Sequence, residues 1–148
     1  MTNIPRTETY IDNSKHEYYE RLRDDANSLF YKEDLIDIYV AAAAIGYYKK
    51  ESKPIRGTKT SIGVMSLMSS NSPNLWIIKS IAIATKGIEV LENLKEVAAA
   101  VEGYANAGID HLINFHDSGG DENEIYSMAL ELMDIIELEG ITQSHRKL

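Results

Sequence analysis

The sequence predicts an all-α fold, a single-domain helical bundle of about five to six helices. The longest apolar run, residues 33–50, contains four consecutive alanines, and alanine has the highest intrinsic helix propensity. Apolar residues recur at spacings of three and four along several other segments, and hardly any stretch alternates as a strand would. A chain of 148 residues is long enough for one core. We therefore expect a flexible arm over residues 1–12, one helical domain over residues 13–140 and a mobile tail over residues 141–148.

The segment 33–50 is expected to be the central helix. Its apolar residues recur every three or four positions and form one stripe, which consists of Leu35, Ile38, Ala42 and Ile45. The alanines leave little side chain at the centre, so neighbouring helices can approach closely. Acids near the start and Lys49 and Lys50 near the end suit the helix dipole, and Pro54 follows. Charges at both ends make the segment a poor membrane span, and we expect no membrane contact.

Two further helices have clear start signals. Ser14 and Glu17 form a capping box, which predicts a helix from about residue 15 to residue 27. Ser72 followed by Pro73 predicts a second start, with serine as the N-cap and proline at the first helical position. That helix, residues 73–86, is apolar nearly all round, so we expect it to be largely buried.

The remaining segments are expected to be shorter helices and loops. Residues 88–94 form a short helix, and residues 95–115 form one helix bent at a glycine or two helices. Residues 51–63 contain proline, glycine and serine and form a loop. Residues 62–68 form either a short extended segment or a helical turn, because a short apolar run fits both. A last amphipathic helix begins near residue 121 and ends before residue 140.

Charge is unevenly distributed along the chain. The net charge is −8, which argues against nucleic-acid binding by the whole surface. Residues 49–86 carry seven bases and one acid, whereas residues 87–140 carry thirteen acids and one base. This asymmetry is typical of polar association, although each patch could also be a solvated face. We expect exposed acids that suit a basic partner protein, namely Glu122, Glu124, Glu131 and Glu137.

Several classes of chemistry lack support in the sequence. The chain contains no cysteine, which excludes disulfides and thiol nucleophiles, and no apolar signal segment begins it, so we expect a cytoplasmic protein. His111 and His116 would lie about 140° apart on a helix, so they cannot share one metal ion. We expect no metal, no cofactor and no enzymatic activity. The enzymatic alternative is a carboxylate metal site that includes Asp24 and Asp25.

One surface loop carries candidate binding chemistry, because cations beside aromatic rings can hold phosphates and stack on bases. These candidate binding residues are Tyr47, Tyr48, Lys49, Lys50, Lys53, Arg56 and Lys59. In the simpler interpretation, the tyrosines complete the core helix and the lysines are solvated.

Several segments together resemble a known family. Residues 30–54, with Lys32, Asp34, Ala41-Ala42 and Gly46-Tyr47, are similar to the pattern K-D-x-F-x-x-A-A-x-x-G-F-K-x-G-x-R-x-P. Residues 81–84 and 102–109 are similar to its later segments A-x-A and E-E-Y-A-N-x-G-I. The order of these segments resembles the small accessory proteins of bacterial DNA phosphorothioation (Dnd) systems. Tyr47 replaces the usual phenylalanine, and residues 50–53 lack the glycine and the arginine of the turn.

The resemblance implies an accessory component of a phage-defence locus that modifies or restricts DNA, and it supplies no catalytic residue. We therefore expect a non-enzymatic adaptor that associates with protein subunits of a defence or DNA-modification complex, as a monomer or small homo-oligomer. The alternative is a module that binds DNA directly through residues 49–59.

Overall fold

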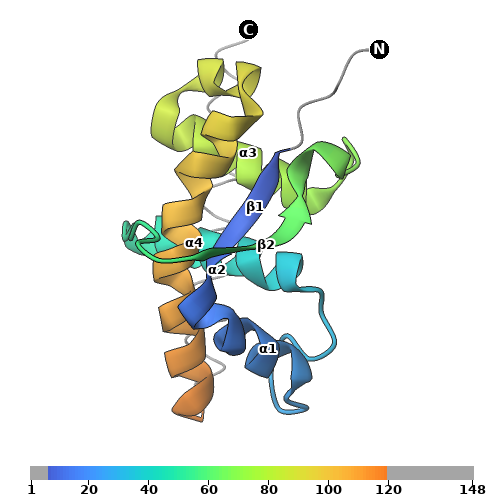
Figure 1. The fold of residues 1–148 in the computed structure, drawn as a ribbon, viewed down its shortest axis with the longest axis vertical. Helices are drawn as coiled ribbons and strands as arrows, with labels where there is room; N and C mark the ends of the chain where they lie inside the picture. The colour runs from blue at the N-terminus through green and yellow to red at the C-terminus, as the bar shows by residue number, and fades with distance from the viewer. Residues whose placement is uncertain (1–6, 120–148) are drawn as a thin grey trace, which may run out of the picture. The chain divides into compact units, whose positions relative to one another are not determined.

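The computed structural model describes residues 7–119 (Figure 1). They form four α-helices, three short 3-10 helices and one small two-stranded antiparallel sheet. The α-helices are α1 (His16–Asp24), α2 (Leu35–Lys49), α3 (Pro73–Lys86) and α4 (Leu94–Asp117). The mainly helical prediction is confirmed, but residues 7–119 contain four α-helices and a small two-stranded sheet, not the five to six helices of an all-α bundle. Residues 88–92 form only the 3-10 helix η3 (Ile88–Glu92), and residues 94–117 form one continuous helix.

Two strands that are distant in sequence pair to form the sheet. Strand β1 (Glu8–Asp12) runs antiparallel to β2 (Lys59–Val64), with Glu8 opposite Val64 and Asp12 opposite Lys59. Thr9 and Ile11 point to the buried side of β1, as expected from the alternation of side chains along a strand. Residues 8–12, which we assigned to a flexible arm, therefore belong to the sheet. For residues 62–68 we left open a short extended segment or a helical turn, and both are present: the end of β2 is followed by the 3-10 helix η2 (Met65–Leu67).

The start of α1 differs from the predicted capping box. The capping side chain belongs to Asp12 and not to Ser14. The Asp12 carboxylate accepts hydrogen bonds from the Ser14 backbone N–H at 3.0 Å and the Ser14 hydroxyl at 2.7 Å. These bonds begin the 3-10 helix η1 (Asn13–Lys15), which continues directly into α1. The hydrogen bonds from Ser14 lower the pKa of the Asp12 carboxyl below its usual range.

Helices α2 and α4 cross in direct contact within the core (Figure 1). Ala42 and Ala43 are fully buried, as expected for a central helix with a small-residue centre. Two glycines bring the backbones into contact: a Cβ at Gly46 would overlap the Tyr104 carbonyl, and a Cβ at Gly108 would overlap the Ala42 carbonyl. The sequence thus permits a close helix crossing that larger side chains would prevent.

Helix α3 begins and ends as predicted. The Ser72 hydroxyl accepts a hydrogen bond from the Leu75 backbone N–H at 3.4 Å, Pro73 occupies the first turn, and Gly87 follows the last residue with a φ of 89°. Its expected burial is only half right. Leu75 and Ile78 are buried, but Trp76 is 65 % exposed and Ile77 is 38 % exposed. One face of this nearly all-apolar helix is therefore in contact with water.

Helix α2 ends at a strained position. Lys50 adopts a left-handed conformation with a φ of 56°, and its N–H donates to the carbonyls of Gly46 and Tyr47. Glycine takes this conformation without a Cβ penalty. Lys50 lies in the turn that lacks the glycine of the resembled pattern.

We expect Lys50→Gly to raise the free energy of unfolding by about 0.5–1 kcal/mol, because relief of the left-handed strain exceeds the flexibility that glycine adds to the unfolded chain. Lys49→Gly is the matched control. Lys49 lies inside the last turn of α2, so glycine should cost about 0.5–1 kcal/mol there. Urea denaturation of both variants measures the difference, and equal shifts would contradict the left-handed cap.

Some expectations concern residues outside those described. They are the amphipathic helix from residue 121, the tail over residues 141–148, and the exposure of four acids, Glu122, Glu124, Glu131 and Glu137. Within residues 7–119, no helix has the length and apolarity needed to span a bilayer.

Candidate functional site: the basic loop on helix α4

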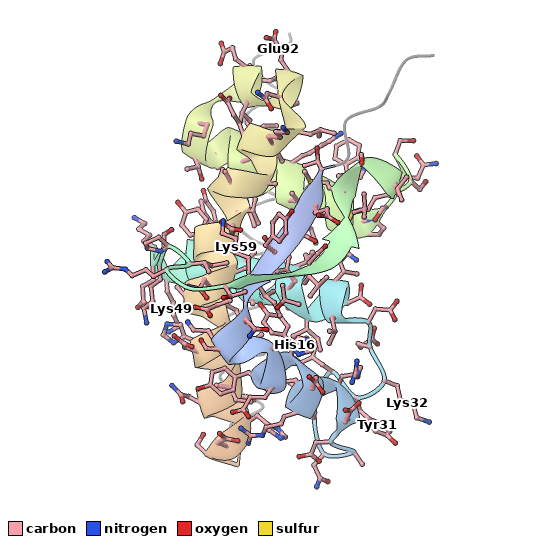
Figure 2. The ribbon with its side chains drawn as sticks, viewed as in Figure 1. His16, Tyr31, Lys32, Lys49, Lys59 and Glu92 are labelled. Carbon is pink, nitrogen blue, oxygen red and sulfur yellow. The ribbon has the colours of Figure 1, made fainter. Side chains whose placement is uncertain are left out.

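The loop between α2 and β2, residues 50–58, lies against α4. The Lys53 backbone N–H donates to the Gly103 carbonyl at 3.0 Å. The Asn106 side-chain amide donates to the carbonyls of Lys53 at 3.1 Å and Pro54 at 3.4 Å. Figure 2 shows Lys49 and Lys59, which bracket the loop, beside α4. The backbone of the loop is therefore fixed by the helix.

The α4 residues that hold the loop share one side of that helix. Glu102, Asn106 and Asp110 recur at a spacing of four, so they lie one above the other along its surface. Gly103 adds room between them, because a Cβ at this position would overlap the Ser52 hydroxyl. These three residues thus form a polar row along α4, which the loop contacts.

Two lysines of the candidate site form ion pairs with the acids of this polar row. Lys53 Nζ lies 3.2 Å from Asp110 Oδ2, and Lys15 Nζ lies 3.1 Å from the same oxygen. Lys59 Nζ contacts both carboxylate oxygens of Glu102, at 3.0 and 3.1 Å, and also lies 5.8 Å from the centre of the Tyr10 ring. Lys53 and Lys59 thus attach the loop to α4, and less of their charge is available to a ligand.

A histidine pairs with the only acid of the loop. The Nε2 of His111 lies 2.8 Å from Glu51 Oε2. A hydrogen bond from the imidazole holds the pKa of the Glu51 carboxyl below its usual range, with a smaller contribution from nearby positive charge. His116 instead contacts Asp25 Oδ2 at 2.8 Å. The two histidines therefore have separate partners, and the described residues hold no group of three or more histidines and acids at metal-binding distances.

The other candidate residues divide into aromatic and charged groups. The rings of Tyr47 and Tyr104 meet edge to face, with centroids 5.7 Å apart, so Tyr47 completes the packing between α2 and α4. Tyr48 is half-buried. Lys49, Lys50 and Arg56 are exposed, and none of them forms an ion pair with another described residue. Three of the seven candidate residues are thus surface cations without an ion pair within residues 7–119, although the charge of Lys49 also acts on the nearby Glu51 carboxylate.

The sequence reasoning missed the residues that organise the loop. Lys15, Glu102, Asn106 and Asp110 had no assigned role, although the four-residue spacing on α4 could have indicated a common face. Asn106 is the least obvious of them. It is only 6 % exposed. Its side chain binds the loop, and its backbone carbonyl accepts a hydrogen bond from Lys15 Nζ at 2.8 Å.

The fold and the site define a small, mainly helical protein in which a basic loop is fixed along α4. The chain matches the family model described as DNA sulphur modification system-associated protein 4 over residues 10–139. It belongs to that family, and the resemblance to Dnd accessory proteins is confirmed. The chain has no match among the curated proteins or the solved structures. Family membership links it to a DNA sulphur modification system.

Proposed function

We propose that the protein is a non-enzymatic accessory subunit that acts by binding another protein of the DNA sulphur modification system. The observation that carries the proposal is the fixed loop. Its backbone is bound to Gly103 and Asn106, and its charges are partly neutralised by Glu102 and Asp110. A surface that is already ordered loses little conformational entropy when a partner binds, which favours specific protein association.

Recovery of the tagged protein from its native host tests this association. We expect co-purification of a sulphur modification protein at low salt and weaker recovery at high salt, because exposed charges steer the encounter. Recovery of the protein alone at both ionic strengths, with the neighbouring genes expressed, would refute the adaptor function.

Direct DNA binding is the second candidate, and the exposed cations Lys49, Lys50 and Arg56 favour it. Three phosphate contacts predict a slope of about −3 in a plot of log binding constant against log salt. The net charge of −8 and the paired state of Lys53 and Lys59 weigh against it.

The triple variant Lys49→Ala, Lys50→Ala and Arg56→Ala separates these candidates. It should fold normally because all three side chains are exposed and Lys53, which attaches the loop, is retained. Under the DNA candidate, duplex binding at low salt falls at least tenfold, whereas Lys95→Ala on α4 leaves it unchanged. Wild-type protein that ignores duplex, nicked and single-stranded DNA at low salt would exclude direct binding.

A further inference from the structure

Helix α3 presents an apolar face to water. Four of its exposed residues, Trp76, Ile77, Ser80 and Ala84, lie within about 100° of one another around the helix axis, so they share one side of the helix. The opposite side is occupied, because Leu75 and Ile78 are buried and the Asn74 amide donates to Asp37 of α2 at 2.7 Å. An exposed apolar face of this kind indicates an interaction site.

Positive charge borders this face on one edge. Lys79 and Lys86 are seven residues apart, which places them two turns apart on the same line along α3, next to Trp76. Neither forms an ion pair with another described residue, and residues 73–86 contain no acid. The face therefore combines a tryptophan anchor, small residues that admit a close neighbour, and two available cations.

These features are unfavourable for antiparallel pairing with a second copy. In an antiparallel pair related by a two-fold axis, each edge of α3 meets the same edge of its partner, so the lysines would oppose each other. Like charges in that position are destabilising. An occupant with acids on the matching edge would remove the repulsion and form two ion pairs.

We infer that the face formed by Trp76, Ile77, Ser80 and Ala84 binds an amphipathic helix of a partner protein, with acidic residues two turns apart against Lys79 and Lys86. The partner helix places its apolar residues on the α3 face in the manner of helix-in-groove recognition. Trp76 is the central anchor, since tryptophan is enriched among the residues that dominate binding energy. This inference rests on the proposed adaptor function and assigns it a surface separate from the basic loop.

The chain contains a single tryptophan, so its fluorescence reports this face directly. The probes are overlapping synthetic peptides of about five helical turns that together cover the proteins of the sulphur modification system. Titration into the full-length protein should identify peptides that shift Trp76 emission to shorter wavelength. We expect those peptides to have apolar residues at helical spacing and acids along one edge.

Charge reversal identifies the contact. The double variant Lys79→Glu and Lys86→Glu should bind the selected peptide at least tenfold more weakly, and a peptide with lysines in place of its edge acids should restore binding. The control Lys32→Glu with Lys95→Glu has the same net charge at exposed positions elsewhere and should bind as wild type does.

Four results would overturn the inference. One is that no peptide shifts the emission, and another is that the charge reversal and its control behave alike. The others are emission of the isolated protein that already corresponds to a buried indole, and a concentration-dependent shift that shows self-association. If full-length partners co-purify while every peptide fails, the adaptor function stands and only the α3 surface is wrong.

Discussion

Gly108→Ala should lower the free energy of unfolding by about 3 kcal/mol, the upper end of the usual range for overpacking. The new Cβ would overlap the Ala42 carbonyl in the backbone of α2, which cannot rotate away. Helix propensity alone predicts the opposite sign, because alanine is favoured over glycine by about 1 kcal/mol inside a helix. The sign of the change therefore distinguishes a close helix crossing from a loose one.

Gly103→Ala is the matched control, since it adds the same methyl group to the same helix. Its Cβ would meet the Ser52 hydroxyl, the end of an exposed side chain that can rotate. We expect its unfolding free energy to stay within about 1 kcal/mol of wild type. If guanidinium denaturation shows Gly108→Ala to be as stable as Gly103→Ala, then α2 and α4 do not cross with their backbones in contact.

Asn106→Ala should cost about 2 kcal/mol of stability and release the basic loop. The buried amide is the donor to the Lys53 and Pro54 carbonyls, and its removal leaves these acceptors unpaired. Lys53 and Asp110 remain as an exposed ion pair, which contributes little by itself. Hydrogen exchange at the Lys53 amide, which is bonded to the Gly103 carbonyl, should become faster than in wild type.

Asn114→Ala provides the comparison for this substitution. Asn114 lies on the same helix but is exposed, so its change in stability should stay within about 0.5 kcal/mol and the Lys53 amide should remain protected. Equal exchange rates in the two variants would show that Asn106 does not hold the loop.

The elements that the sequence predicted well have local signals. The limits of α3 follow from Ser72, Pro73 and Gly87, which act within one or two turns of the helix ends. The burial of Ala42 and Ala43 follows from the apolar run around them. These signals need no knowledge of the rest of the chain.

The elements that were missed depend on contacts between distant residues. Strand β1 has only five residues, and it pairs with a strand about fifty positions away, so neither strand has a strong pattern of its own. The cap is at Asp12 and not at Ser14 because η1 begins at Asn13, two residues before the predicted start of the helix. Trp76 was expected in the core because apolar composition does not distinguish an exposed apolar face from a buried one.

The candidate site was predicted only in part for the same reason. The loop cations were evident in the sequence, but their acidic partners Glu102 and Asp110 lie more than forty residues away. The family segment that includes Asn106 and Gly108 has a structural role here: Asn106 binds the loop and Gly108 admits α2. Part of the resemblance therefore reflects how the loop and the helices are held together.

One sedimentation experiment tests the adaptor function most directly. The protein is co-expressed with the other proteins of its sulphur modification system, the sample is treated with nuclease, and the sedimentation of the protein is measured. Nuclease removes any bridge of DNA, so only contacts between proteins remain. We predict that the protein sediments with a larger sulphur modification protein and that this complex survives the nuclease. Sedimentation of the protein alone after nuclease treatment would contradict the proposal that it acts by protein association.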